Sequence, residues 1–156
     1  MVTFEDIRRG LAANLTAVPG FHVFLYLMDA PTLPALQVAG IRTIDYDIEF
    51  HGPSGSMEGH RLTVVIEAAV PKGSNEQAQK TLDQLHSDKS VKAAIEADGD
   101  NSGALYSRLS DSGTVVTDQL AACDALRVIS YDLNGSFTLN SGVEVALATW
   151  DVDILV

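Results

Sequence analysis

Apolar residues recur along this chain first with helical spacing and then with the alternation of β-strands. Between Thr3 and Ala17 they fall three or four positions apart, which predicts an amphipathic helix. Thr3 and Asp6 have the spacing of a capping box, and this pair predicts where the helix begins. From Phe21 to Met28 both alternating faces are apolar, so that run predicts a buried strand.

The clearest alternation follows in two segments that a polar loop separates. After a short predicted strand from Ala35 to Ile41, the residues from Asp45 to Phe50 place apolar side chains on one face and carboxylates on the other. His60 to Val70 alternates in the same way. The loop between them, HGPSGSMEGH, is rich in glycine and serine and is expected to be exposed. DYDIEF and HRLTVVIEAAV are therefore predicted to form a hairpin with a long tip.

Two helices are predicted after that hairpin. Pro71 and Gly73 end the strand, and Ser74 or Asn75 is placed to cap a helix at its N-terminus. Ser90 has the same position ahead of a second helix. The apolar positions expected to be buried are Ala78, Leu82 and Leu85 in the first helix and Val91, Ala94 and Ile95 in the second.

Two further strands are predicted from Ala122 to Leu133 and from Gly142 to Val156, with turn signals between them. The last strand changes its polar face midway, which predicts a β-bulge near Ala148 or Thr149. Together these elements predict an α+β fold in a single domain spanning residues 1–156. We expect an antiparallel or mixed sheet of about six strands, with two to three helices packed on one face.

Composition is that of an ordinary globular protein except for its charge. Hydrophobic residues make up 46% of the 156 residues and charged residues 20%, which suits one domain with its own core. The net charge of -11 argues against a nucleic-acid-binding surface, which needs clustered lysine and arginine. The single cysteine, Cys123, lies among apolar residues and is expected to be a buried thiol. The chain has no signal-peptide pattern and no long apolar run, so we expect a product of the cytoplasm with no membrane segment.

Carboxylates aligned on strand faces are the polar pattern with most bearing on function. Asp45, Asp47 and Glu49 share one face of their strand, and Asp151 and Asp153 share a face of the last strand. If these strands are neighbours, the five carboxylates form one surface, and three interpretations stay open. The surface is a solvent-exposed sheet face, a site for a hard divalent cation, or an electronegative wall that repels polyanions.

No catalytic or metal-binding motif accompanies these residues. The loop from Asp98 to Gly103 begins like a calcium-binding EF-hand loop, but its twelfth position is Leu109 in place of a bidentate glutamate. The histidines lack the spacing of a zinc site, and GxSxG, GxGxxG, Walker A and CxxC motifs are absent. We therefore predict a protein that is not an enzyme and that needs no cofactor.

The order of several short segments is similar to that of a known protein family. The first helix ends in AVPGFHVFLYL, a proline-containing segment leads to PALQVAGI, and DYDIEFHGPSG and RLTVVIEAAV follow. The most specific segment is SVKAAIEAD, which comes after a helix carrying Leu-Asp and before a closing two-strand hairpin. Over nearly its whole length the chain resembles the tail terminator, or tail completion, proteins of long-tailed bacteriophages, especially those that infect actinobacteria. It departs from them by longer segments at Ser110 to Cys123 and at Asn134 to Gly142.

This resemblance implies a structural role in the virion. Tail terminators form a homo-oligomeric ring, usually a hexamer, on the tail tube protein at the head-proximal end of the tail. They stop polymerisation and present a surface to the head-side connector protein, while DNA passes through the channel without specific binding. The loop residues expected to contact a neighbouring subunit or partner are His51, Pro53, Ser54, Met57, Glu58, Asp111, Thr114 and Thr117. The residues expected to face the channel and repel DNA are Asp45, Asp47, Glu49, Asp151 and Asp153.

Two other functions stay open at this point. A neck or head-completion protein would occupy the adjoining place in the same junction, on the portal side. A small α+β domain of another class could instead hold a divalent cation on the acidic strand faces.

Overall fold

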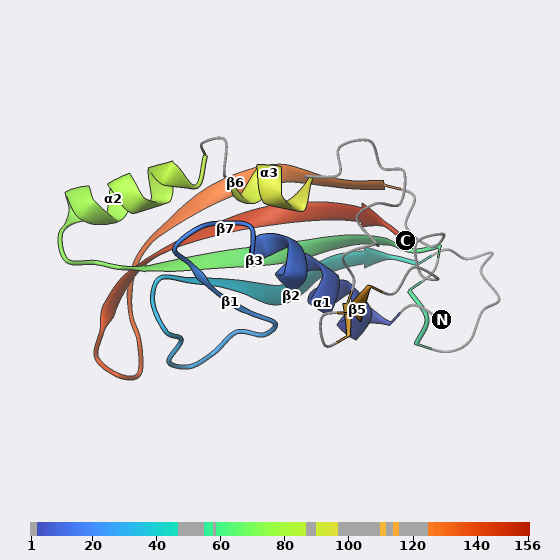
Figure 1. Ribbon diagram of the computed structural model, residues 1–156, viewed down its shortest axis with the longest axis horizontal. Helices are drawn as coiled ribbons and strands as arrows, with labels where there is room; N and C mark the ends of the chain where they lie inside the picture. The colour runs from blue at the N-terminus through green and yellow to red at the C-terminus, as the bar shows by residue number, and fades with distance from the viewer. Residues whose placement is uncertain are drawn as a thin grey trace.

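The computed structural model shows a curved sheet with helices packed against it (Figure 1). It describes residues 3–46, 55–57, 59–86, 90–96, 110–111, 114–115 and 125–156. The elements are, in chain order, α1 (Phe4–Leu15), β1 (His22–Phe24), β2 (Ala35–Asp45), β3 (Arg61–Pro71), α2 (Asn75–Gln84), α3 (Val91–Ile95), β4 (Ser110–Asp111), β5 (Thr114–Val115), β6 (Ala125–Thr138) and β7 (Glu144–Leu155).

Five of the strands form a mixed sheet in the order β1-β2-β3-β7-β6. β1 is parallel to β2, and each of the other neighbouring pairs is antiparallel. β4 and β5 form a separate two-stranded ladder. The predicted α+β class is confirmed, with five strands in the main sheet where about six were expected.

Two strands that were predicted separately are one strand in the structure. β2 continues through the expected break and reaches Asp45, which pairs with Arg61 of β3. The register of this pairing shifts beside Gly40, whose backbone φ of 150° suits glycine and lets the strand bend without ending. The partner of β3 is therefore mainly the strand that was predicted separately, from Ala35 on, and of the predicted partner DYDIEF only Asp45 pairs with β3. Residues 47–50 lie outside the described residues.

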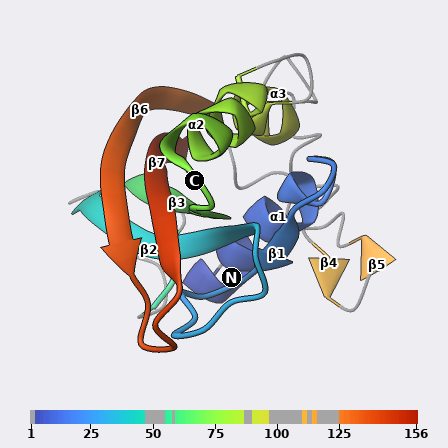
Figure 2. The ribbon, with the colours of Figure 1, turned by 90° about the vertical axis from the view of Figure 1, so that its left-hand side faces the viewer.

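All three helices lie on the concave side of the sheet, which curves around them (Figure 2). β3 supplies the centre of the core, because its alternate side chains from Leu62 to Val70 have no exposed surface. The predicted buried positions of α2 and α3 are confirmed at every residue. The core residues of α1 are Ile7, Leu11, Ala12 and Leu15.

The predicted helix starts are confirmed by their hydrogen bonds. The Thr3 hydroxyl accepts from the backbone N–H of Asp6 at 3.3 Å, and the Asp6 carboxylate accepts from the backbone N–H of Thr3 at 2.9 Å. The Ser74 and Ser90 side chains cap α2 and α3 in the same way. Each cap satisfies an N–H group that has no partner inside its helix, which typically stabilises the fold by about 1 kcal/mol.

The β-bulge predicted near Ala148 or Thr149 is wrong. β7 pairs with β3 in uninterrupted register, and the shifts of the β6–β7 hairpin lie in β6, beside Ile129 and Asn134. The even-numbered side chains of β7 from Ala146 to Ile154 are buried on the helix side along the whole strand. Only the opposite face changes from apolar to acidic, because its surroundings differ from one end of the strand to the other.

The buried strand predicted from Phe21 to Met28 is wrong in its extent and in its burial, since none of these residues is buried. β1 ends at Phe24, and the side chains of Tyr26, Leu27 and Met28 beyond it are 50%, 52% and 48% exposed. Among the described strands β1 has one neighbour, β2, so the segment that continues from it is not covered by the sheet. An apolar run shows that burial of its side chains is favourable, but it does not show which segment or partner protein buries them.

Arg8 connects the segment after β1 to the rest of the fold. Its guanidinium donates hydrogen bonds to the backbone carbonyls of Leu25, at 2.5 Å, and of Val38. It also lies 4.4 Å from the ring centroid of Tyr26, in a cation–π contact. α1 therefore holds this segment next to β2 where strand pairing has stopped.

Replacing Asn14 by leucine is expected to stabilise the domain. Asn14 lies on the buried side of α1 with no exposed surface, and neither atom of its amide group finds a partner among the described residues. Leucine has the same number and branching of side-chain heavy atoms and removes two unsatisfied polar atoms, so Asn14→Leu should gain about 1 kcal/mol in the free energy of unfolding. Urea denaturation measures this gain. Asn14→Ala, which leaves a void, serves as the control, and a loss of stability in Asn14→Leu would contradict the prediction.

Candidate functional site

The loop residues predicted to contact a partner are described only in part. Met57 lies just before β3 and packs, partly buried, against the core. Asp111 and Thr114 are paired with each other in the β4–β5 ladder. The remaining ones, His51, Pro53, Ser54, Glu58 and Thr117, lie outside the described residues. Their role as contacts stays a prediction.

The two acidic strand faces are not direct neighbours. β3 lies between β2 and β7, so a full strand separates Asp45 from Asp151 and Asp153. Arg61 of β3 occupies that position and donates hydrogen bonds to Asp153 at 2.7 and 3.0 Å. These bonds lower the pKa of Asp153. The other two predicted members, Asp47 and Glu49, lie outside the described residues.

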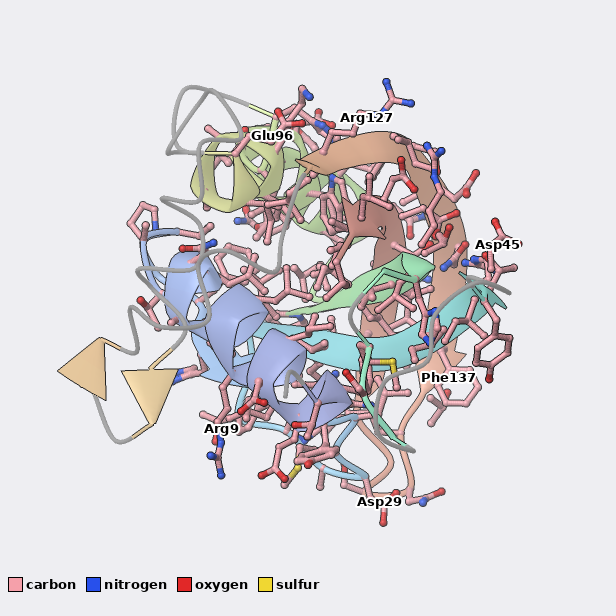
Figure 3. All side chains as sticks on the ribbon, turned by 90° about the vertical axis from the view of Figure 1, so that its right-hand side faces the viewer. Arg9, Asp29, Asp45, Glu96, Arg127 and Phe137 are labelled. Carbon is pink, nitrogen blue, oxygen red and sulfur yellow. The ribbon has the colours of Figure 1, made fainter. Side chains whose placement is uncertain are left out.

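Arginines from three strands accompany the carboxylates of this surface. Arg42 of β2 lies 3.1 Å from Asp151, and Arg127 of β6 lies 3.7 Å from Asp153. Figure 3 shows Arg127 and Asp45 projecting from the outer side of the curved sheet, away from the helices. In the part of the chain that the structure describes, this surface is a network of ion pairs and not a purely electronegative wall. No group of three or more His, Cys, Asp or Glu residues there is placed to hold a metal ion.

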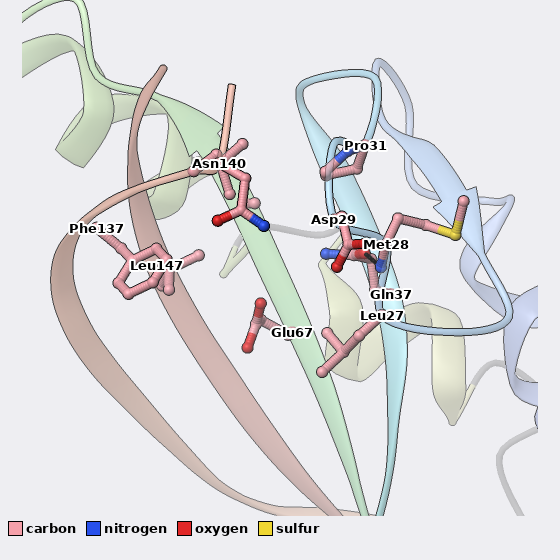
Figure 4. A pocket seen from close by; sticks show the side chains of 11 residues that line it. Leu27, Met28, Asp29, Pro31, Gln37, Glu67, Phe137, Asn140 and Leu147 are labelled. Atoms are coloured by element: carbon pink, nitrogen blue, oxygen red, sulfur yellow. Dashed lines mark hydrogen bonds between the residues drawn. The ribbon is translucent and has the colours of Figure 1, made fainter. Parts of the chain in front are cut away.

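A pocket of about 350 Å³ lies on the face of the sheet opposite the helices (Figure 4). Gln37, Glu67 and Leu147, from β2, β3 and β7, form its floor. The segment after β1 forms one wall with Met28, and the end of β6 forms the other wall with Phe137. Two segments distant in sequence thus enclose the centre of the sheet, and the face of β7 beneath them is accordingly apolar.

Glu67 is the chemically distinctive residue of this pocket. Strand pairing places it between Gln37 and Thr149 in the middle of the sheet. Its carboxylate points into the space between the two walls (Figure 4). Burial raises the pKa of Glu67, and no Lys, Arg or His within the described ranges pairs with it. A partly buried carboxylate without a cation is unfavourable, and it marks a position where a positive charge would be stabilised.

The polar neighbours of Glu67 are engaged elsewhere. Gln37 is 2% exposed, and its side-chain oxygen accepts a hydrogen bond from the backbone N–H of Met28 at 2.7 Å. The Thr149 hydroxyl accepts one from the side-chain amide of Asn134 at 3.2 Å. The side chains of Gln37 and Thr149 thus hold neighbouring segments in place around the pocket. Sequence reasoning missed Glu67, because in the sequence it is one of several polar residues that alternate in a strand.

Replacing Glu67 by glutamine is expected to stabilise the domain near neutral pH. The folded state raises the pKa of Glu67, so its charged form is disfavoured on folding; the wild-type chain therefore loses stability as pH rises through that pKa. Glu67→Gln removes this cost, with a gain of roughly 0.5–1 kcal/mol for a partly exposed group. The gain should vanish below about pH 4, where glutamate is neutral in both states.

Chemical denaturation of both chains across this pH range measures the effect. Glu144→Gln removes the same charge from an exposed position outside the pocket and should change stability by less than about 0.5 kcal/mol. A gain from Glu67→Gln that is the same at low and neutral pH would show that burial of the charge is not its cause.

The outer edge of β6 is a second candidate surface. β6 is an edge strand, and its backbone N–H at Val128 donates to the Glu96 carboxylate at 2.9 Å. Over residues 129–138 no backbone hydrogen bond joins this edge to another part of the described chain. The large apolar side chains exposed along it are Ile129, Leu133 and Phe137, at 48%, 57% and 58%. An uncovered edge with exposed apolar side chains is a template for pairing with another chain.

Comparison of the sequence with protein-family models finds no match, and comparison with curated proteins finds no similar sequence. Within the described parts of the chain, none of the helices has the length and apolarity required to cross a membrane.

Proposed function

We propose that this chain is a structural protein of a long-tailed bacteriophage. It caps the tail tube as a ring, stops tail polymerisation and joins the tail to the head connector. The structural observation that carries the proposal is the outer edge of β6 over residues 129–138, which pairs with no other described strand and has exposed apolar side chains. The resemblance of the sequence to tail terminators supplies the identity of the assembly.

A closed ring requires two unlike surfaces on each subunit, because head-to-tail contacts are heterologous. The outer edge of β6 provides one such surface. β1 lies at the other end of the strand order, and the half-exposed Tyr26, Leu27 and Met28 follow it. Leu27, Met28 and Phe137 face the same pocket, so the two separate surfaces are the β6 edge at Ile129 and Leu133 and the β1 side at Tyr26. Two different apolar surfaces on one subunit favour a ring over a symmetric dimer, in which each surface would meet its own copy.

The charge of the chain suits a channel that DNA crosses. A net charge of -11 repels DNA and keeps it from binding to the walls. Because Asp151 and Asp153 are paired with arginines, this repulsion is assigned to the chain as a whole and not to those two side chains alone.

Virions and assembly products test this proposal. Mass spectrometry of purified virions should find the chain, and electron microscopy should place it as one ring at the head-proximal end of the tail. Tails assembled in its absence should be overlong. Absence from virions, or an obligate dimer in solution, would contradict a tail-capping ring.

A neck protein on the portal side is the alternative that this experiment separates. Without a neck protein, tails keep their normal length and fail to join heads. That outcome would assign the chain to the neck, on the portal side of the same head–tail junction.

A further inference from the structure

We infer that the pocket around Glu67 binds a lysine or arginine side chain of a different protein. The pocket is complete within one chain, so the inference does not rest on the ring. The walls of the pocket include Phe137 and Leu27, which the proposed ring contacts also use, but Glu67 belongs to the pocket alone. Glu67→Gln and Leu133→Lys therefore test the pocket and the ring separately.

The pocket has the shape and chemistry for a long cationic side chain. Leu147 on the floor and Phe137 and Leu27 on the walls offer apolar contacts for the aliphatic part of lysine or arginine. Glu67 lies between these walls and Asp29 stands at one side of the opening, so a charged end group meets carboxylates (Figure 4). At about 350 Å³ the space is near the lower end of ligand pockets, roughly 300–1,000 Å³, which suits a side chain better than a large ligand.

Other classes of occupant fit less well. A calcium or magnesium ion needs about six oxygen ligands, and the Gln37 oxygen is already used by the backbone of Met28. An anion would be repelled by Glu67 and Asp29. A purely apolar group would leave the Glu67 carboxylate covered and unpaired, at a desolvation cost that a cation offsets.

Charge complementarity favours a different protein over a second copy of this chain as the source. A second copy would have to supply a lysine or arginine that is not already engaged within its own chain. Most of the chain's described lysines and arginines already pair with carboxylates, and Arg8 is held by backbone carbonyls. The paired side chains are Arg9, Arg42, Arg61, Lys80, Lys92 and Arg127.

Titration of the isotope-labelled full chain with capped amino acids tests the inference by NMR. The probes are N-acetyl-lysine methylamide, N-acetyl-arginine methylamide and the uncharged N-acetyl-norleucine methylamide. The two cationic probes should shift the backbone amides of Met28, Glu67 and Leu147 in a saturable way, at millimolar concentrations. The norleucine probe should bind about tenfold more weakly, because its side chain contacts the apolar walls but leaves the Glu67 carboxylate unpaired.

Two variants show whether the pocket carboxylates cause the selectivity. Glu67→Gln should weaken binding of both cationic probes about tenfold, and Asp29→Asn should weaken it less, since Asp29 is exposed. Glu144→Gln changes the net charge equally outside the pocket and should leave binding unchanged. Equal binding of norleucine, unchanged binding in Glu67→Gln, or the absence of saturable shifts would overturn the inference.

Sedimentation velocity of the wild-type and Glu67→Gln proteins tests separately whether the cationic side chain comes from another protein or from a second copy. Glu67→Gln should leave self-association unchanged, since the cation comes from another protein. Weaker self-association in Glu67→Gln would assign the cation to a second copy and would overturn that part of the inference.

Discussion

Replacing Val64 by aspartate is expected to unfold the domain. Val64 has no exposed surface and lies in the central strand, between Ile41 of β2 and Val152 of β7, on the helix side of the sheet. A carboxylate at this position would lose its hydration and gain no partner. The cost of several kcal/mol is comparable to the whole stability of a domain, about 5–15 kcal/mol. Circular dichroism during urea titration should show no cooperative transition.

The neighbouring residue provides a matched control. Val65 is only partly buried, and its side chain is on the opposite face of β3. Val65→Asp should therefore remain folded, with a loss of about 1–2 kcal/mol. A cooperative transition in Val64→Asp close to that of the wild-type chain would contradict the placement of this face in the core.

The parts of the fold that depend on local chemistry were predictable from the sequence. Thr3 and Ser90 cap their helices, and the alternation along β3 places Val64 in the core. In each case the residues that decide the structure lie within a few positions of one another. A capping hydroxyl meets an N–H three residues later, and strand alternation needs no knowledge of the neighbouring strands.

The errors concern pairing and cover, which depend on distant parts of the chain. The apolar run that includes Tyr26 and Leu27 has a strand-like composition, yet it is an exposed continuation of an edge strand. The change of polarity along β7 was interpreted as a bulge, but it follows from a wall over Leu147 and an arginine beside Asp151. Neither neighbour can be identified from the local pattern.

The candidate sites divide in the same way. The alignment of Asp151 and Asp153 on one face was correctly predicted, since it needs only the period of a strand. That Arg42 and Arg61 would pair with them depends on strand order, which the sequence left open. Predicting the pocket around Glu67 would have required the order of three strands and the positions of two walls that are far apart in sequence.

Replacing Leu133 by lysine is expected to prevent assembly of the proposed ring. Leu133 is 57% exposed at the centre of the uncovered stretch of β6, where a neighbouring subunit would pair with the edge. Lysine on an edge strand opposes pairing, because each contact in the ring would then bury an unpaired ammonium group. A closed ring repeats this cost at every interface, so the loss of assembly should be nearly complete. Native mass spectrometry, with and without tail tubes present, measures the distribution of oligomers.

Stability and a second lysine variant separate assembly from folding. Because Leu133 is largely exposed, the free energy of unfolding of Leu133→Lys should lie within about 0.5 kcal/mol of the wild-type value. Val143→Lys adds the same charge at another exposed apolar residue, in the turn between β6 and β7, and should still assemble. If Leu133→Lys forms rings as readily as Val143→Lys does, the outer edge of β6 is not the subunit contact. The ring would then have to close through the β1 side and the loops predicted to contact a partner.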